Sequence, residues 1–280
     1  MIYIHPFQNS TTYEMAGFKY NGYLLILNYT KFLDPAWTRT QTLQDVRKLR
    51  KHFERLGFRV QVKNNLDDIQ TISALDALVA DDKGILKQCA ALWLIVMSHG
   101  DTTTEFLTSS YPLSHDLDVL PKFSDTNCPS LEGIPKIFLL LTCRGFATQV
   151  YHRRLGTATT PVQTAAPSAV PDSGESPGAA ANTSSSTPEP TGELLRDTFV
   201  VYSTQEGFTT HRSPLTGSYA VNSLIKAIED NPGMEFKEVL QEFKRDYEKT
   251  PKFGKVIETR DLGFNKSYYI QPSNGSDGSG

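Results

Sequence analysis

Residues 136–145 read KIFLLLTCRG, and this stretch decides the fold. Residues 137–141 are all apolar, with neither the alternation of a half-buried strand nor the spacing of an amphipathic helix. An unbroken apolar run of this length is typical of a strand that is buried on both faces, as in a parallel sheet covered by helices. Cys143 lies at the end of this expected strand, and Gly145 follows it.

The same alternation of buried strands and helical patterns extends in both directions from this stretch. Further strands are expected in residues 23–28, 58–62, 89–97, 198–204, 255–260 and 266–271. Apolar residues at helical spacing predict helices over 43–56, 69–79, 219–228 and 236–247, and Gly57 is expected to end the first of them. Strands that alternate with helices in this way predict an α/β fold with a mostly parallel, doubly wound sheet.

One segment departs sharply from the average composition. Residues 157–192 contain six prolines and no aromatic residue, Leu, Ile or Met, so they offer too little apolar area to offset the entropy of ordering. We expect a disordered linker, for which a plain spacer between domains is the simplest interpretation. The predicted organisation is a short N-terminal peptide (1–12), a large region (13–156), the linker (157–192), a small region (193–272) and a flexible tail (273–280).

Charge and apolar content exclude several classes of protein. Lys and Arg number 28 against 31 Asp and Glu, a net charge of −3, which gives no basic surface for nucleic acid or an acidic membrane. The longest apolar run, 89–97, is far shorter than the roughly 20 residues of a membrane-spanning helix, and no secretory signal is apparent at the start. Three cysteines in 280 residues argue for a reducing compartment. We therefore expect a soluble, cytoplasmic protein.

A cysteine and a histidine follow two of the expected strands. His99 comes two residues after the strand that ends at Met97, and Cys143 lies 44 residues further on. Because the carboxyl ends of parallel strands meet at one edge of the sheet, the two side chains should lie close together. Such a pair suits nucleophilic catalysis, in which the imidazole takes the thiol proton and the thiolate attacks a carbonyl. Taken singly, a histidine or a cysteine of this kind is more often structural, but the joint placement of His99 and Cys143 at two strand ends favours catalysis.

Other uses of these residue types lack their usual spacing. The chain has no C-x-x-C or H-x-x-H pair and neither of the common glycine-rich phosphate loops. No metal and no cofactor are expected.

Several separated blocks resemble the caspase family of cysteine endopeptidases. They are GYLLILNYTKF from Gly22, RTQTLQDVRKLRKHFERLGFRVQVKNNL from Arg39, SHGD from Ser98, IPKIFLLLTCRG from Ile134 and VYSTQEGFTTHRSPLTGSY from Val201. The blocks occur in the family's order and cover nearly the whole chain outside the linker. The resemblance implies a caspase-like α/β fold with a large subunit (13–156) and a small subunit (193–272), joined by a linker that is cut to activate a zymogen. Since the match begins near Tyr13, the chain resembles the short-prodomain, effector-like type.

The resemblance also assigns catalytic roles. It implies that Cys143 is the nucleophile and His99 the general acid and base. The backbone N–H groups of Gly100 and Cys143 correspond to the oxyanion hole.

Substrate-binding positions follow from the same resemblance, with two departures from it. Arg39 and Arg212 stand where the family binds an aspartate side chain at P1, and Thr210 lies in the same substrate-binding segment. The family's glutamine two residues before the nucleophile is Leu141 here, and a tryptophan before the second arginine is His211. Losing the polar contact of the glutamine predicts a weaker protease rather than an inactive one.

The resemblance leaves three functions to weigh. The leading one is cleavage of protein substrates after P1 aspartate, with glutamate as a second P1 residue, in apoptotic or immune proteolysis. Activation is expected from an upstream caspase that cuts after Asp172 or, alternatively, Asp197. The protein would act as a homodimer or as a heterodimer with another caspase. The second is a catalytically weakened decoy that regulates an active caspase by pairing through the strand near 255–260. The third, cleavage after basic residues, is disfavoured because Arg39 and Arg212 would repel such a side chain.

Overall fold

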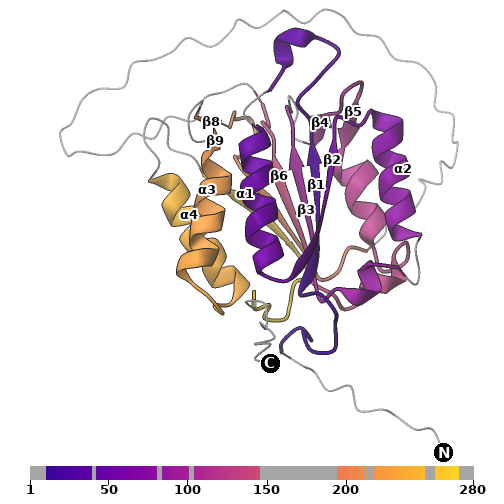
Figure 1. Cartoon of the computed structure of the whole chain (residues 1–280), viewed down its shortest axis with the longest axis vertical. Coiled ribbons are helices and arrows are strands. Elements are labelled where there is room, and N and C mark those ends of the chain that lie inside the picture. Colours follow the sequence, from indigo (N-terminus) through magenta and orange to yellow (C-terminus); the bar gives the residue numbers. More distant parts are fainter. Residues whose placement is uncertain are drawn as a thin grey trace, which may run out of the picture. The chain divides into compact units, whose positions relative to one another are not determined.

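A six-stranded sheet forms the centre of the computed structural model, which describes residues 11–39, 42–80, 84–100, 104–145, 194–210, 212–213, 217–249 and 256–270 (Figure 1). Its strands are β1 (Gly22–Asn28), β2 (Phe58–Asn64), β3 (Leu92–Met97), β6 (Lys136–Leu141), β7 (Thr198–Tyr202) and β10 (Glu258–Leu262). In space they lie in the order β10-β7-β6-β3-β1-β2, and only β10 runs antiparallel to its neighbour. The predicted mostly parallel sheet is therefore confirmed.

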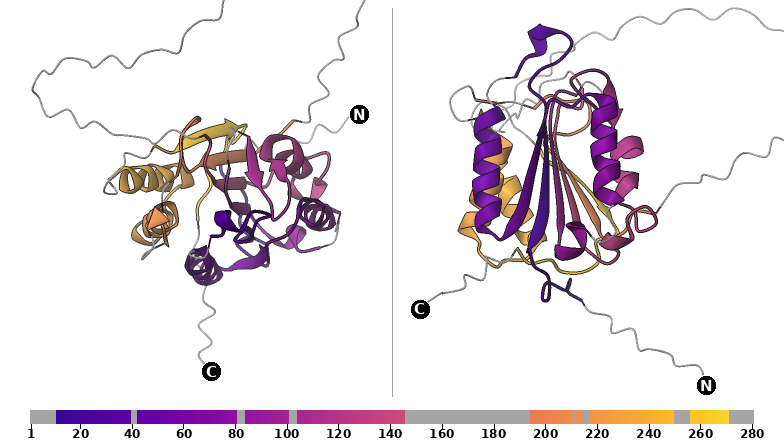
Figure 2. Two further views of the ribbon diagram at one scale, coloured as in Figure 1. Left: turned by 90° about the horizontal axis from the view of Figure 1, so that it is seen from above. Right: turned by 45° about the vertical axis from the view of Figure 1, so that its right-hand side comes forward.

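Helices cover both faces of this sheet (Figure 2). On one face lie α1 (Thr42–Arg55), α3 (Tyr219–Asp230) and α4 (Phe236–Glu248), and on the other lies α2 (Asp68–Val79). α1 ends just before Gly57, whose φ of 78° is the left-handed conformation that terminates helices, and α2 begins with a capping box between Asp67 and Gln70. Two small hairpins stand outside the sheet: β4 (Glu105–Leu107) with β5 (Pro112–Ser114), and β8 (Arg212–Ser213) with β9 (Gly217–Ser218).

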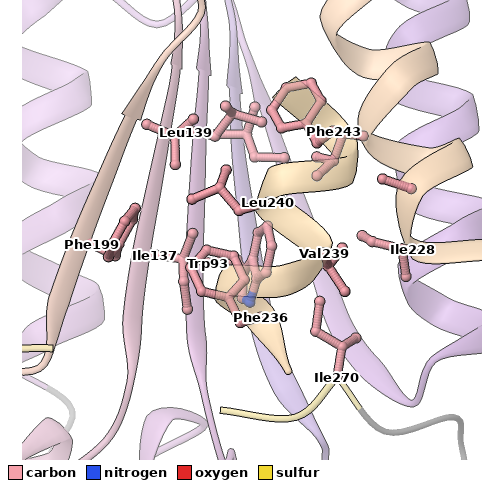
Figure 3. Packing of buried hydrophobic residues seen from close by; sticks show 14 of the residues in the cluster. Trp93, Ile137, Leu139, Phe199, Ile228, Phe236, Val239, Leu240, Phe243 and Ile270 are labelled. Atoms are coloured by element: carbon pink, nitrogen blue, oxygen red, sulfur yellow. The ribbon is translucent and has the colours of Figure 1, made fainter. Parts of the chain in front are cut away.

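The two helical layers explain why the central strands are apolar without interruption. Along β3, Trp93 and Ile95 pack into the cluster beneath α1, α3 and α4, whereas Leu94 and Val96 pack into the cluster beneath α2. Figure 3 shows Trp93 against Phe236 in the first cluster. Because both faces of β3 are covered, every side chain along it is apolar.

The segments before and after the linker share the sheet. β6 and β7 pair in parallel from Lys136 opposite Thr198 to Leu140 opposite Tyr202. The linker (157–192) and the tail (273–280) lie outside the described residues. None of the helices in the described segments is long and apolar enough to span a bilayer.

The expected strand over 266–271 is wrong. The described part of this segment makes only isolated bridges, Thr12 with Ser267 and Glu235 with Tyr269. Its alternation arises because Tyr268 and Ile270 pack into the core beneath α4, whose first residue, Phe236, donates its N–H to the carbonyl oxygen of Tyr268 at 2.7 Å. The other expected strand, 255–260, begins later, as β10.

Candidate active site

Two adjacent strands deliver the candidate catalytic residues. Met97 at the end of β3 is directly paired with Leu141 at the end of β6. His99 follows Met97 by two residues, and Cys143 follows Leu141 by two residues. A Cβ placed on Gly100 would lie 2.4 Å from the carbonyl oxygen of Cys143. Only a glycine allows the two backbones to approach so closely, so the structure brings the two segments into contact.

His99 is held in one orientation by residues far away in the sequence. Its ring lies between those of Phe32 and Trp37, with centroid distances of 5.0 and 5.1 Å, and its Nε2 lies 2.8 Å from the carbonyl oxygen of Trp37. A carbonyl oxygen can only accept a hydrogen bond, so Nε2 carries the hydrogen. Burial lowers the pKa of His99, an effect that the bond to Trp37 partly offsets, so the ring is neutral at pH 7. The lone pair is then on Nδ1, which makes Nδ1 the candidate base.

Cys143 is half-buried and protonated in this arrangement. Burial raises the pKa of its thiol, although the backbone N–H of Thr210 donates to Sγ over 3.4 Å and partly offsets the shift. The thiol therefore needs a base before it can act as a nucleophile. The contact also places Thr210, predicted as a substrate-binding residue, at the sulfur atom.

The other substrate-binding positions lie around the same end of the sheet or outside the described residues. Arg39 precedes α1, and its Nη1 atom is buried with no hydrogen-bond partner in the described part of the chain. Leu141 is 1% exposed and packs into the apolar cluster with Leu139. Arg212 lies in β8, where the backbone alone is described, and His211 is outside the described residues.

The sequence analysis missed Arg144, the residue after the candidate nucleophile. Its N–H donates to the carbonyl oxygen of Phe208 at 2.9 Å, and its own carbonyl accepts from Gly207 at 2.6 Å. Its guanidinium group stacks 4.0 Å from the centre of the Tyr202 ring and forms a 2.8 Å ion pair with Glu258 in β10. Arg144 thus ties the loop of the candidate nucleophile to the edge strand of the small region. The sequence around Arg144 does not indicate these contacts, because every residue that Arg144 is seen to contact here lies beyond the linker.

The ion pair to Glu258 leads to a prediction about stability. Glu258→Gln should lower the free energy of unfolding by about 1–2 kcal/mol, because the buried guanidinium group of Arg144 loses its opposite charge. The loss is below that of a fully buried pair because the Glu258 side chain is 34% exposed. Urea unfolding measures it. The control is Glu242→Gln, which breaks an exposed pair with Arg245 and should cost less than about 0.5 kcal/mol. Equal losses in the two variants would contradict the assignment.

Within the described segments, no group of three or more His, Cys, Asp and Glu side chains could hold a metal ion. The reactive groups that the structure offers at this end of the sheet are the thiol of Cys143 and the imidazole of His99.

Comparison with known proteins gives matches in sequence and in fold. The family model described as "Caspase domain" matches residues 21–266. Human Caspase-9 is 31% identical over 219 residues, which cover 72% of this chain and 50% of that protein, and Caspase Dronc of Drosophila melanogaster is 26% identical over 274 residues, covering 93% and 58%. The chain thus spans about half the length of these curated relatives. The crystal structure of Caspase-1 from Spodoptera frugiperda superposes with a TM-score of 0.74 at 18% identity, over 98% of each chain, which confirms the predicted fold.

Proposed function

Because the chain belongs to the caspase family, we propose that it is a cysteine endopeptidase that cleaves proteins after aspartate, and less readily after glutamate, in apoptotic or immune proteolysis. The observation that carries this proposal is the local geometry of His99 and Cys143. The two residues follow paired strand ends, and the bond from His99 Nε2 to Trp37 leaves Nδ1 free to take the thiol proton.

The chemistry then runs in two halves. His99 Nδ1 takes the proton of Cys143, and Sγ bonds to the substrate carbonyl carbon while the N–H groups of Gly100 and Cys143 stabilise the oxyanion. His99 passes the proton to the leaving amine as the peptide bond breaks, which leaves a thioester. His99 next takes a proton from water, the hydroxide attacks the thioester, and the released thiolate regains its proton.

Selection of an acidic P1 side chain is assigned to Arg39 and Arg212. The buried Nη1 of Arg39, which has no partner among the described residues, is costly in the free protein and would be satisfied by a carboxylate oxygen of the substrate. Leu141 contributes no polar group, so the carboxylate has one fewer donor than in relatives with a glutamine at that position.

Restoring that donor gives a prediction. Leu141→Gln should raise kcat/KM on P1-aspartate peptides roughly tenfold, because a hydrogen bond to a charged group is worth about 1.5–3 kcal/mol and part of this offsets the apolar packing lost. Steady-state kinetics measure the effect. Leu141→Met, which keeps the apolar packing and adds no donor, should show no gain. A folded Leu141→Gln variant without higher activity would disprove this role for position 141.

Activation is assigned to a cut after Asp172, which lies outside the described residues. The alternative, Asp197, is an unsuitable place to cut because its carbonyl oxygen accepts from Lys136 at 2.7 Å and its side chain accepts from Tyr13 at 2.8 Å. Cleavage there would have to pull the start of β7 out of the sheet. We assign the cut to an upstream caspase.

Pairing is assigned to β10. In the described part of the chain β10 is an edge strand of the six-stranded sheet, and an edge strand offers backbone groups on which a second chain can add. The partner is either another copy of this chain or another caspase. The cytoplasmic location remains a prediction.

The second candidate function is the decoy that pairs with an active caspase, and it is favoured by Leu141. One experiment separates the two functions: a panel of fluorogenic tetrapeptides with Asp, Glu, Arg or Lys at P1, tested on the linker-cleaved protein beside Cys143→Ala. The protease hypothesis expects turnover after Asp, slower turnover after Glu and none after Arg or Lys. If the protein is no more active than Cys143→Ala on every peptide, the protease hypothesis is wrong and the decoy hypothesis remains. Turnover after Arg or Lys alone would overturn the P1 assignment.

A further inference from the structure

A buried carboxylate on α1 contacts the hairpin that carries Arg212. Asp45 is 0% exposed, and each of its carboxylate oxygens lies 3.0 Å from the backbone nitrogen of Ser218. The neighbouring Gly217 has a φ of 81°, and a Cβ at that position would lie 2.2 Å from Asp45 Oδ1. The carboxylate therefore rests directly on the backbone of β9.

This contact lies between the two segments to which P1 binding is assigned. Ser218 is the ladder partner of Arg212 in the β8–β9 hairpin. Arg39 precedes the first residue of α1 by three positions, and Asp45 lies in the first turn of that helix. One side chain thus joins a segment before the linker to a segment after it, and each of these segments carries one of the arginines.

Burial makes ionisation of Asp45 energetically unfavourable. Burial raises the pKa of Asp45 to about 6, although the Ser218 amide and Lys48 partly offset the shift. Of the charged side chains on α1, Lys48 is the one that acts on Asp45. β9 carries no ionisable side chain, and Tyr219 begins α3 beside it. Residues 40–41 and 214–216 are Thr-Gln and Pro-Leu-Thr and bring no ionisable group. His211, which directly precedes β8 in the sequence, is a further ionisable residue beside the two arginines. Within the described residues, the Asp45 carboxylate accepts only from the Ser218 amide, and a buried carboxylate with so few partners is poorly explained by stability.

We propose that Asp45 is a positioning residue of the P1 site, which keeps β9, and through the ladder Arg212, in register with Arg39. The inference rests on the proposed function. When Asp45 is ionised, it holds the Ser218 N–H by a charge-assisted hydrogen bond. As the pH falls through about 6, it gains a proton, the bond weakens, and the hairpin is held less firmly.

Kinetics of substitution variants test the positioning role. Asp45→Asn keeps one neutral acceptor and should raise KM for a P1-aspartate peptide roughly tenfold while kcat changes less than about twofold, because positioning of the substrate is lost rather than chemistry. Asp45→Ala should raise KM further. The matched control is Glu54→Gln, which removes an exposed carboxylate from the same helix and should leave both constants unchanged. Unchanged KM in a folded Asp45→Asn variant, or a loss confined to kcat, would overturn the proposal.

A second measurement is independent of activity. In the amide spectrum of the Cys143→Ala protein, the Ser218 resonance should shift with a midpoint near pH 6, and the shift should vanish when Asp45→Asn is added. A Ser218 amide that does not titrate, or that titrates equally without Asp45, would refute the contact. If the amide titrates but the wild-type protein cleaves no acidic peptide, the contact stands while the P1 roles of Asp45 and both arginines fall together with the proposed function.

Discussion

Replacing Cys143 with alanine should lower kcat/KM on P1-aspartate peptides by at least about 10⁴-fold, to the background of the assay. The imidazole of His99 would still be held by Trp37, but no atom would remain to form the bond to the substrate carbonyl carbon. A water molecule activated by His99 is a poor substitute, because its oxygen is not held in place beside the scissile bond. Progress curves at high enzyme concentration, recorded beside the wild-type protein, measure the residual rate.

The other two cysteines provide matched controls for this substitution. Cys128 and Cys89 are fully buried, and burial raises the pKa of Cys89 to about 12, so neither thiol is available as a nucleophile. Cys128→Ala should keep kcat/KM within about twofold and should lose only about 1 kcal/mol of stability, from the small cavity that it leaves. Retention of more than a hundredth of the activity in Cys143→Ala, or an equal loss in Cys128→Ala, would rule out Cys143 as the nucleophile.

The layout of the sheet was predictable from the sequence because it depends on local patterns. β3 is apolar at every position and β6 at every position after Lys136, and such runs are typical of strands that are covered on both faces. Once these strands were recognised as parallel, their carboxyl ends had to lie at one edge, which placed His99 and Cys143 near each other before any geometry was known.

The details of the site were less predictable because they depend on contacts across long stretches of chain. The bond that orients His99 comes from the backbone carbonyl of Trp37, and a carbonyl group has no signature in the sequence. In α1, the apolar spacing that predicts the helix begins at Leu43, yet Leu43 is 51% exposed and Asp45 is buried. The first turn of this helix meets the glycine backbone of β9, where a carboxylate fits and can accept a hydrogen bond, and only the fold brings that backbone there.

The strongest test of specificity is at Arg39, whose Nη1 atom is buried and unpaired within the described residues. A buried guanidinium nitrogen without an acceptor is destabilising, and a bound carboxylate would remove that penalty. The free protein therefore bears an unfavourable free energy at Arg39, and binding of a P1 aspartate removes it. The effects of Arg39 on activity and on stability are therefore separable, since the group that favours substrate binding does not favour folding.

Arg39→Ala should lower kcat/KM on P1-aspartate peptides by about 10² to 10³-fold, while the free energy of unfolding stays the same or rises. Arg39→Lys keeps the charge without the planar fork and should recover only part of the loss. The control is Arg55→Ala, which removes an exposed arginine that pairs with Glu229 on the same side of the sheet and should leave kcat/KM within about twofold. Parallel kinetics and urea unfolding give both quantities. If Arg39→Ala kept the wild-type preference for aspartate over asparagine at P1, the carboxylate would have to be bound elsewhere. If it lost stability and activity together, Arg39 would be a structural residue, because only a group that is unsatisfied in the free protein can be removed without cost to the fold.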